Sequence, residues 1–258
     1  MPPLRVLVTR PAHDAAAWVQ RLSAPGIAPE ALPLIEIVPE PPGAGLAAAR
    51  PHLPDYAAAM FVSGNAVTHL LGSDQHFSAG ATATRAWSPG PGTTAALLQA
   101  GWPAARIDAP VADAPQFDSE ALWARVAAQV QAGMRVLLVR GGDAQGRVAG
   151  RDWLRAQLAQ AGAQVDTVVV YRRRAPLLDE GQKRRAQAAA TDGTLWLFSS
   201  AEAIANLRQC LPHVDWRAAR ALVTHPRIGA AARAAGFGAV HETQPTVDAV
   251  RASIESLA

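Results

Sequence analysis

Six short segments rich in serine, threonine, glycine and arginine carry the side chains that could do chemistry in this sequence. They are TRPAHD (9–14), SGNA (63–66), SPGPGTTA (88–95), RGGDAQGR (140–147), SSAEA (199–203) and THPRIG (224–229). All but the segment 88–95 follow or overlap the end of an apolar run of strand length. Small residues at a helix start leave backbone N–H groups open to an anion, which the helix dipole also attracts. Each segment is therefore a candidate seat for a carboxylate or a phosphate.

The side chains in these segments have two interpretations. Ser and Thr often do no more than cap a helix, but six such segments in one chain favour a ligand with several negative charges. Arginine replaces lysine almost throughout, with Lys183 the only lysine. A GC-rich genome would encode that bias, and a guanidinium also binds carboxylates with two parallel hydrogen bonds. The candidate binding residues are Arg10, Ser63, Asn65, Thr93, Thr94, Arg140, Arg147, Ser199, Ser200, Thr224 and Arg227.

Several other chemistries find little support. Cys210 is the only cysteine, which excludes an intramolecular disulfide and a multi-cysteine metal site. The sequence has no H-E-x-x-H spacing, no G-x-S-x-G motif and no Gly-Lys-Ser/Thr phosphate loop. Gly90, Gly92 and Ala95 form a short G-x-G-x-x-A pattern with Asp108 downstream, so an NAD(P)-dependent oxidoreductase stays open as an alternative. We expect no metal and no cofactor.

Tyr171 is the candidate catalytic residue. It ends the apolar run DTVVVY (166–171), where the chain is expected to cross between two domains. A phenol there could donate a proton to a leaving oxygen. A tyrosine at a strand end also often serves as an amphipathic hinge residue with a satisfied hydroxyl. Both interpretations stay open at this point.

An internal repeat indicates how these segments are positioned. RVLVTR (5–10) returns as RVLLVR (135–140), FVSGNAVTHL (61–70) as FSSAEAIANL (198–207), and PGTTAALLQAG (91–101) as PRIGAAARAAG (226–236). The offset is far longer than the period of a solenoid repeat. The sequence therefore predicts a duplicated domain.

Each repeat unit is a short apolar run, a polar turn and an amphipathic helix, which predicts parallel sheets of about five strands covered by helices on both faces. The runs are VLVT (6–9), AAMFVS (58–63), RVLLVR (135–140), VVVY (168–171), LWLF (195–198) and ALVT (221–224). We expect a helix over 120–133 that Asp118 or Ser119 caps and Gly133 ends, and a last helix that opens at Thr246. Ligands of such sheets bind beyond the carboxyl ends of the strands.

The domain boundary has two possible positions. Tandem duplication would place it near residue 133. The proline- and glycine-rich stretch 38–54 suggests instead that the chain starts one domain, builds the other, and returns near Tyr171.

Composition narrows the class of protein. The chain has 258 residues, half of them hydrophobic, and a formal net charge of +3. No apolar run approaches the roughly 20 residues of a membrane span, and the N-terminus lacks a signal-peptide pattern. The clusters YRRR (171–174) and KRR (183–185) are too short and too poor in aromatic residues for a nucleic-acid surface. We expect a soluble cytoplasmic protein that binds neither nucleic acid nor membrane.

Taken together, the motifs resemble the uroporphyrinogen-III synthase family over nearly the whole chain. The resemblance lies in VLVTRP (6–11), FVSGNAV (61–67), GPGTTAALLQAG (90–101), VLLVRGGDAQGR (136–147), LFSSAEAI (197–204) and PRIGAAARAAGF (226–237). Two stretches depart from the family pattern: FVSGNAV, where many members carry Ser-Pro-Arg, and VRGG (139–142). The resemblance implies two flavodoxin-like α/β domains joined by a two-stranded linker. One domain would comprise 1–37 with 175–258 and the other 42–168, and the connections would be 38–41 and 169–174.

The resemblance also implies a substrate and a reaction. The substrate is hydroxymethylbilane, a linear tetrapyrrole with eight carboxylates, which hydroxymethylbilane synthase would hand over to a monomeric enzyme. Loss of the ring A hydroxyl gives an azafulvene, ring D attacks through its substituted carbon, and the resulting spiro intermediate fragments and recloses with ring D inverted. The segments would hold carboxylates in a cleft between the domains, and Tyr171 would assist the loss of water in tetrapyrrole and haem biosynthesis. A non-catalytic two-domain anion-binding protein is the other alternative.

Overall fold

The computed structural model of the chain describes residues 2–41, 43, 49–72, 83–111, 113–148 and 152–257. Residue 42, at which the expected second domain begins, and residues 44–48 of the linker-like stretch 38–54 lie outside these ranges. The described chain is a mixed α/β fold with two sheets, as the sequence predicts. Its residues divide into two compact units, Met1–Glu36 with Arg174–Ala258, and Ile37–Arg173.

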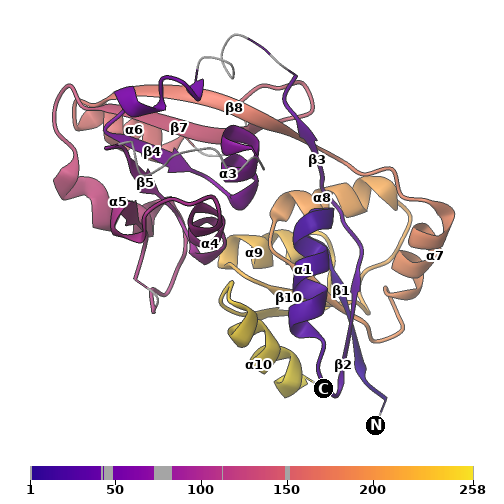
Figure 1. Ribbon diagram of the computed structural model, residues 1–258. Coiled ribbons are helices and arrows are strands. Elements are labelled where there is room, and N and C mark those ends of the chain that lie inside the picture. Colours follow the sequence, from indigo (N-terminus) through magenta and orange to yellow (C-terminus); the bar gives the residue numbers. More distant parts are fainter. Residues whose placement is uncertain are drawn as a thin grey trace. The chain divides into compact units, whose positions relative to one another are not determined.

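The first unit is built on a five-stranded parallel sheet with the order β11-β10-β9-β1-β2. Figure 1 labels β1, β2 and β10 of this sheet. Its strands are β1 (Leu4–Val8), β2 (Ile27–Ala31), β9 (Leu195–Phe198), β10 (Arg220–Val223) and β11 (Ala239–Glu242). Its helices are α1 (Ala12–Leu22), α7 (Glu180–Ala188), α8 (Ala201–Cys210), α9 (Pro226–Ala234) and α10 (Val247–Leu257). The two ends of the chain thus build one sheet.

Strand β9 shows why a continuous apolar run is needed in this sheet. All four of its residues are buried, and alternate side chains point to opposite faces. Leu195 and Leu197 pack with residues of α1 and α10. Trp196 and Phe198 belong to an aromatic cluster with Trp216 and Phe237, whose ring centroids lie 5.4–6.2 Å apart. Both faces of the sheet are therefore covered.

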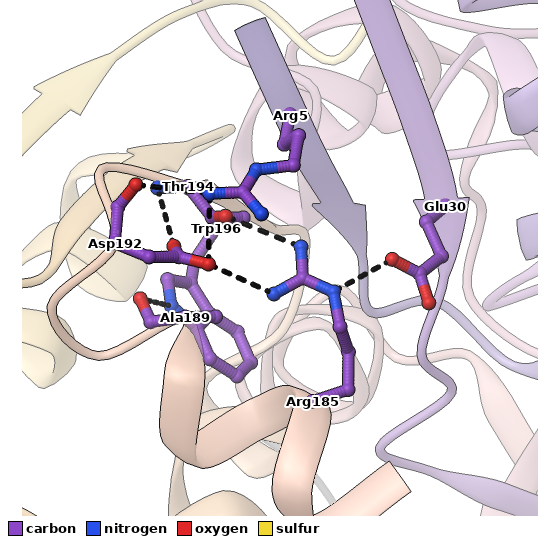
Figure 2. A network of polar contacts seen from close by, with 7 residues as sticks. All are labelled: Arg5, Glu30, Arg185, Ala189, Asp192, Thr194 and Trp196. Atoms are coloured by element: carbon purple, nitrogen blue, oxygen red, sulfur yellow. Dashed lines mark hydrogen bonds and ion pairs between the residues drawn. The ribbon is translucent and has the colours of Figure 1, made fainter. Parts of the chain in front are cut away.

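A polar network connects α7 with β1 and β2, the two strands nearest the N-terminus (Figure 2). The Arg185 guanidinium on α7 contacts Glu30 of β2 at 2.8 Å, and it donates to the Thr194 hydroxyl at 3.2 Å. Asp192 accepts from Arg5 of β1 at 2.9 Å and lies 3.5 Å from Arg185. The contacts of Arg185 with Glu30 and of Arg5 with Asp192 join residues more than 150 positions apart in the sequence.

The second unit contains a six-stranded sheet with the order β3-β8-β7-β4-β5-β6. Its strands are β3 (Glu36–Pro39), β4 (Ala58–Phe61), β5 (Arg85–Trp87), β6 (Ile107–Asp108), β7 (Arg135–Gly142) and β8 (Gln164–Arg174). Its helices are α3 (Gly64–Leu71), α4 (Pro91–Gln99), α5 (Ser119–Val126) and α6 (Trp153–Gln160), with short 3-10 turns at Leu53–Asp55, Ala104–Arg106 and Ala127–Gln129.

Alternation along β4 assigns the helices of this unit to the two faces. Ala59 and Phe61 pack in a cluster that contains residues of α3 and α4. Ala58 and Met60 pack in another with residues of α5 and α6. Because β4 is buried on both sides, its sequence is continuously apolar, as expected for a central parallel strand.

The two sheets have the same strand order once the repeats are aligned. The repeats match β7 with β1 and β4 with β9. The strands that follow them along the chain then also match, which pairs β8 with β2, β5 with β10 and β6 with β11. With these equivalences, β8-β7-β4-β5-β6 corresponds to β2-β1-β9-β10-β11. This agreement supports an internal duplication. In the first unit, β1 and β2 precede β9, β10 and β11 along the chain, whereas in the second unit the matching β7 and β8 follow β4, β5 and β6.

Two element boundaries differ from the sequence prediction. The helix expected over 120–133 ends at Val126 and continues as a 3-10 turn, because Val130 and Met134 turn inward to pack against the core. Strand β8 does not end at Tyr171 but runs on to Arg174. This extension lies next to β3 in the sheet and carries two bidentate ion pairs, Arg172 with Glu40 and Arg174 with Glu36.

Candidate functional site

The carboxyl edge of the first unit gathers five predicted binding residues. Arg10 follows β1, Ser199 and Ser200 follow β9, and Thr224 and Arg227 follow β10. These three strands are neighbours in the sheet. The backbone N–H groups of Thr9 and Thr224 donate to Leu197 and Phe198 at 3.3 and 3.2 Å, so the three strand ends are level.

Arg10 has the most unusual environment of these residues. Its guanidinium carbon lies 4.0 Å from the centroid of the Trp18 ring, and burial lowers its pKa from 12.5 to about 10 although Asp14 opposes the shift. It is still a cation at neutral pH. Its buried Nε has no hydrogen-bond partner among the described residues. A buried donor without an acceptor is costly, and a carboxylate would satisfy it.

The start of α1 supplies further donors beside Arg10. Its N-cap residue is Pro11, and no side chain caps the helix. The first N–H groups of α1 are therefore open to an anion of the kind that the helix dipole attracts.

The other residues of this edge are partly engaged as caps. Ser200 accepts from the Glu202 N–H at 3.2 Å and caps α8, and Thr224 is buried. His225 caps α9 by accepting from the Arg227 N–H at 3.1 Å, and the exposed Arg227 guanidinium lies 3.2 Å from the other nitrogen of the His225 ring. A serine that caps by accepting still has its own proton to donate.

The carboxyl edge of the second unit gathers the other predicted residues. Ser63 and Asn65 follow β4, Thr93 and Thr94 lie in the first turns of α4 after β5, and Arg140, Arg147 and Tyr171 come from β7, the turn after it, and β8. The strands β8-β7-β4-β5 are consecutive in the sheet. The structure thus brings together, within this unit, residues that come from four separate segments.

Ser63 and Tyr171 form the central pair of this edge. Their hydroxyl oxygens lie 3.1 Å apart, although 108 positions separate them in the sequence. Ser63 also caps α3 by accepting from the Ala66 N–H at 3.2 Å. Tyr171 is 2% exposed, and its ring centroid lies 5.6 Å from that of His69 on α3.

Both arginines of this edge already contact a carboxylate. Arg140, which is buried, donates to Asp152 at 3.0 Å, and the exposed Arg147 donates to Asp143 at 2.8 Å. The sequence analysis did not single out these aspartates, although Asp143 lies in the same segment and Asp152 begins the next helix. Thr94 is likewise engaged and donates to Ser88 at 2.9 Å.

Comparisons with known proteins identify the family and the fold of the chain. The sequence model of the uroporphyrinogen-III synthase HemD family matches residues 16–251. The chain belongs to the uroporphyrinogen-III synthase family. Its fold is similar to that of the uroporphyrinogen-III synthetase of Helicobacter pylori, with a TM-score of 0.57, 14% identity and complete coverage of both chains. It is also similar to a mutant uroporphyrinogen III synthase of Thermus thermophilus, with a TM-score of 0.54, 17% identity and 98% coverage of each.

Family membership gives the reaction. This family converts hydroxymethylbilane to uroporphyrinogen III, a cofactor-independent lyase reaction of tetrapyrrole biosynthesis. In the described part of the chain no helix is both long and apolar enough to cross a membrane. Among the same residues, no group of three or more His, Cys, Asp or Glu side chains could hold a metal ion.

The dinucleotide alternative is not favoured. Asp108, which would bind a ribose in that interpretation, instead accepts two hydrogen bonds from Arg85 at 2.6 and 2.7 Å and one from Gln129 at 3.2 Å. The Gly90 carbonyl accepts from Ser88 and Thr94, which closes the turn on itself. Gly90 is the N-cap of α4, so this glycine-rich turn opens a helix.

Proposed function

We propose that Tyr171 is the acid that assists the loss of water from hydroxymethylbilane in this enzyme. The observation that carries the proposal is its 3.1 Å contact with Ser63. Ser63 accepts from the Ala66 N–H, so its own proton is free to point at the Tyr171 oxygen. The phenol proton is then left for the substrate.

The reaction needs one proton at the leaving oxygen. Tyr171 donates it as the ring A C–O bond breaks, the pyrrole nitrogen supplies the electron pair, and water leaves with formation of the azafulvene. Ring D attacks through its substituted carbon, and the spiro intermediate then fragments and recloses with ring D inverted. The proton that ring D loses as it regains aromaticity balances the one that Tyr171 donated.

We further propose that the carboxyl edges of both sheets bind substrate carboxylates. Arg10 and the uncapped start of α1 form the best-supported carboxylate-binding site, because the buried Nε of Arg10 needs an acceptor. Ser63, Asn65, Thr93, Thr94, Ser199, Ser200, Thr224 and Arg227 would supply hydroxyl, amide and guanidinium donors. Arg140 and Arg147 would bind substrate only by sharing or exchanging their aspartate partners. Holding the bilane in a folded conformation favours the inverted closure over spontaneous closure to the symmetric isomer I.

The substitution Tyr171→Phe tests the acid role. We expect kcat to fall on the order of 100-fold, which is a typical contribution of a positioned acid. KM should change less than about twofold, because a group that acts in the transition state affects kcat. Chromatography of the oxidised products should show isomer I replacing isomer III.

Tyr56→Phe is the matched control for this measurement. Tyr56 is the only other tyrosine, and its hydroxyl donates to Asp166 at 2.9 Å, near the opposite end of β8 from Tyr171. We expect its kcat and isomer ratio to equal those of the wild type. If Tyr171→Phe forms isomer III at the wild-type rate, Tyr171 is not the acid.

The proposal also includes the setting of the enzyme. We propose that it acts in the cytoplasm as a monomer and receives hydroxymethylbilane from hydroxymethylbilane synthase. Sedimentation of the purified chain, alone and mixed with that synthase, tests the monomer and the transfer contact. A stable dimer would contradict the monomer, and sedimentation of the two enzymes as separate species in the mixture would contradict the transfer contact.

A further inference from the structure

A β-bulge brings a glycine opposite the candidate acid. Strands β7 and β8 pair in parallel register from Arg135 with Gln164 to Arg140 with Val169. The register then shifts, and Gly141 pairs with Tyr171. The bulge therefore moves Tyr171, in place of Val170, to the position opposite Gly141.

The Tyr171 ring occupies the place that a side chain at position 141 would take. A Cβ atom built on Gly141 would lie closer than 3.0 Å to two ring carbons of Tyr171, and 2.8 Å from its hydroxyl oxygen. Aromatic rings cover glycines on neighbouring strands in other sheets too. Here the hydroxyl end of the ring, the part that would do the chemistry, lies over the glycine.

Space, and not backbone conformation, explains the glycine at this position. Gly141 is not among the described glycines with positive φ, so an alanine could adopt its backbone angles. The ring has little freedom to move aside, because Tyr171 is 2% exposed and belongs to the buried cluster beneath α3 and α4. An added methyl group would therefore displace the hydroxyl or the strand.

We propose that Gly141 is a positioning residue that places the Tyr171 hydroxyl beside Ser63. Together with the bulge, it leaves a slot on β7 that the Tyr171 ring occupies. The inference rests on the proposed role of Tyr171 for its effect on catalysis. Its geometric part stands independently, because the position of the ring can be measured without substrate.

The first experiment reads the position of the ring directly. The enzyme is labelled with 3-fluorotyrosine, which gives one ¹⁹F resonance each for Tyr56 and Tyr171, and Tyr171→Phe assigns them. We expect Gly141→Ala to shift or broaden the Tyr171 resonance and leave that of Tyr56 unchanged. Gly43→Ala is the control, because a Cβ at Gly43 meets nothing closer than 3.7 Å. It should move neither resonance.

The second experiment is a double-mutant comparison of kcat for Gly141→Ala, Tyr171→Phe and the double variant. We expect Gly141→Ala to lower kcat at least tenfold with little change in KM, and to raise the share of isomer I. The double variant should be no slower than Tyr171→Phe alone, since both substitutions remove the same hydroxyl function.

Each outcome has one meaning. The positioning role is overturned if Gly141→Ala leaves the Tyr171 resonance unchanged. It is also overturned if the fold-loss of kcat in the double variant equals the product of the fold-losses in the two single variants. If Gly141→Ala displaces the Tyr171 resonance while Tyr171→Phe keeps wild-type activity, the slot is supported and only the acid role is contradicted. If Gly141→Ala does not fold, Gly141→Ala with Tyr171→Leu, which removes the ring from the slot, should restore the fold. Failure of that variant to fold also overturns the inference.

Discussion

At the scale of single residues, the candidate site depends on how burial changes the properties of its side chains. Arg10 is a cation stacked on Trp18 with a buried donor that no described group accepts. Sequence alone placed Arg10 in a candidate segment. It did not show the stacking, because Trp18 lies on the following helix and its contact requires the turn at Pro11.

The substitution Arg10→Met tests the carboxylate seat. Methionine keeps the apolar contact with Trp18 and removes the charge. A hydrogen bond to a charged group contributes about 1.5–3 kcal/mol, so we expect KM for hydroxymethylbilane to rise roughly 10- to 100-fold. Arg21→Met, on the exposed last turn of α1, should leave KM unchanged, and equal KM values for the two variants would remove Arg10 from the binding site.

His69, beside Tyr171 in the second unit, provides a pH-dependent measurement. Burial lowers its pKa below the ordinary value of 6.5, so the folded state favours the neutral ring. The corresponding stability is fully present above pH 6.5 and is lost as the pH falls through the lowered folded-state pKa. We expect His69→Phe, which keeps a ring beside Tyr171, to lose less stability than the wild type between pH 7.5 and pH 5. Urea unfolding at both pH values checks this, and identical losses would contradict it.

At the scale of elements, the apolar runs were predicted well from sequence, but the role of Gly133 was not, because the helix that it was expected to end already ends at Val126. Gly133 has a φ of +80°, a conformation that only glycine adopts readily, so a turn at this position is encoded locally. The end of α5 at Val126 was not predictable, because it depends on Val130 and Met134 reaching a core formed by distant segments. The length of β8 was missed for a similar reason, since its last residues form ion pairs with Glu36 and Glu40, which lie more than 130 positions earlier in the sequence.

The network around α7 gives a prediction about this element. Arg185→Met removes contacts to Glu30, Asp192 and Thr194 and leaves their polar groups without that partner. We expect the free energy of unfolding to fall by about 1–3 kcal/mol, with kcat unchanged at temperatures where the variant is folded. Arg184→Met changes an exposed neighbour on the same helix and should stay within about 0.5 kcal/mol of the wild type. Equal stability of the two variants would show that the network contributes nothing measurable.

At the scale of the whole molecule, the repeat explains why sequence reasoning reached the fold. The matched segments carry the strand order of both sheets, so one half of the chain predicts the arrangement of the other. The site was harder to predict, because its pairs cross segments. Ser63 and Tyr171 were predicted for different reasons, and only the register of β7 with both β8 and β4 brings their hydroxyl oxygens to 3.1 Å. The aspartates that occupy Arg140 and Arg147 were missed since nothing in their spacing marks them as partners.

The division into two units leads to a prediction about folding. Glu36 and Arg174 lie next to the unit boundary, and their side chains are joined by hydrogen bonds of 2.7 and 2.8 Å. The chain ends created by removing residues 37–173 are therefore close enough for a short turn to rejoin them. All five strands of the first sheet, and the network around Arg185, would stay intact.

We expect both pieces to fold separately as domains. A chain of 1–36 joined by a Gly-Asn turn to 174–258, and a second chain of 37–173, should each show a cooperative thermal transition and dispersed amide resonances. Neither piece should make uroporphyrinogen III alone, because each holds only part of the proposed binding set, and Tyr171 is in the second. The control is 1–36 joined to 184–258, which lacks the Arg174 pair and the first residues of α7 and should unfold at a lower temperature. If the rejoined first unit shows no cooperative transition, the compact units are not independent domains. The strands β3 and β8, where the chain passes between the units, would then be needed for both units to fold.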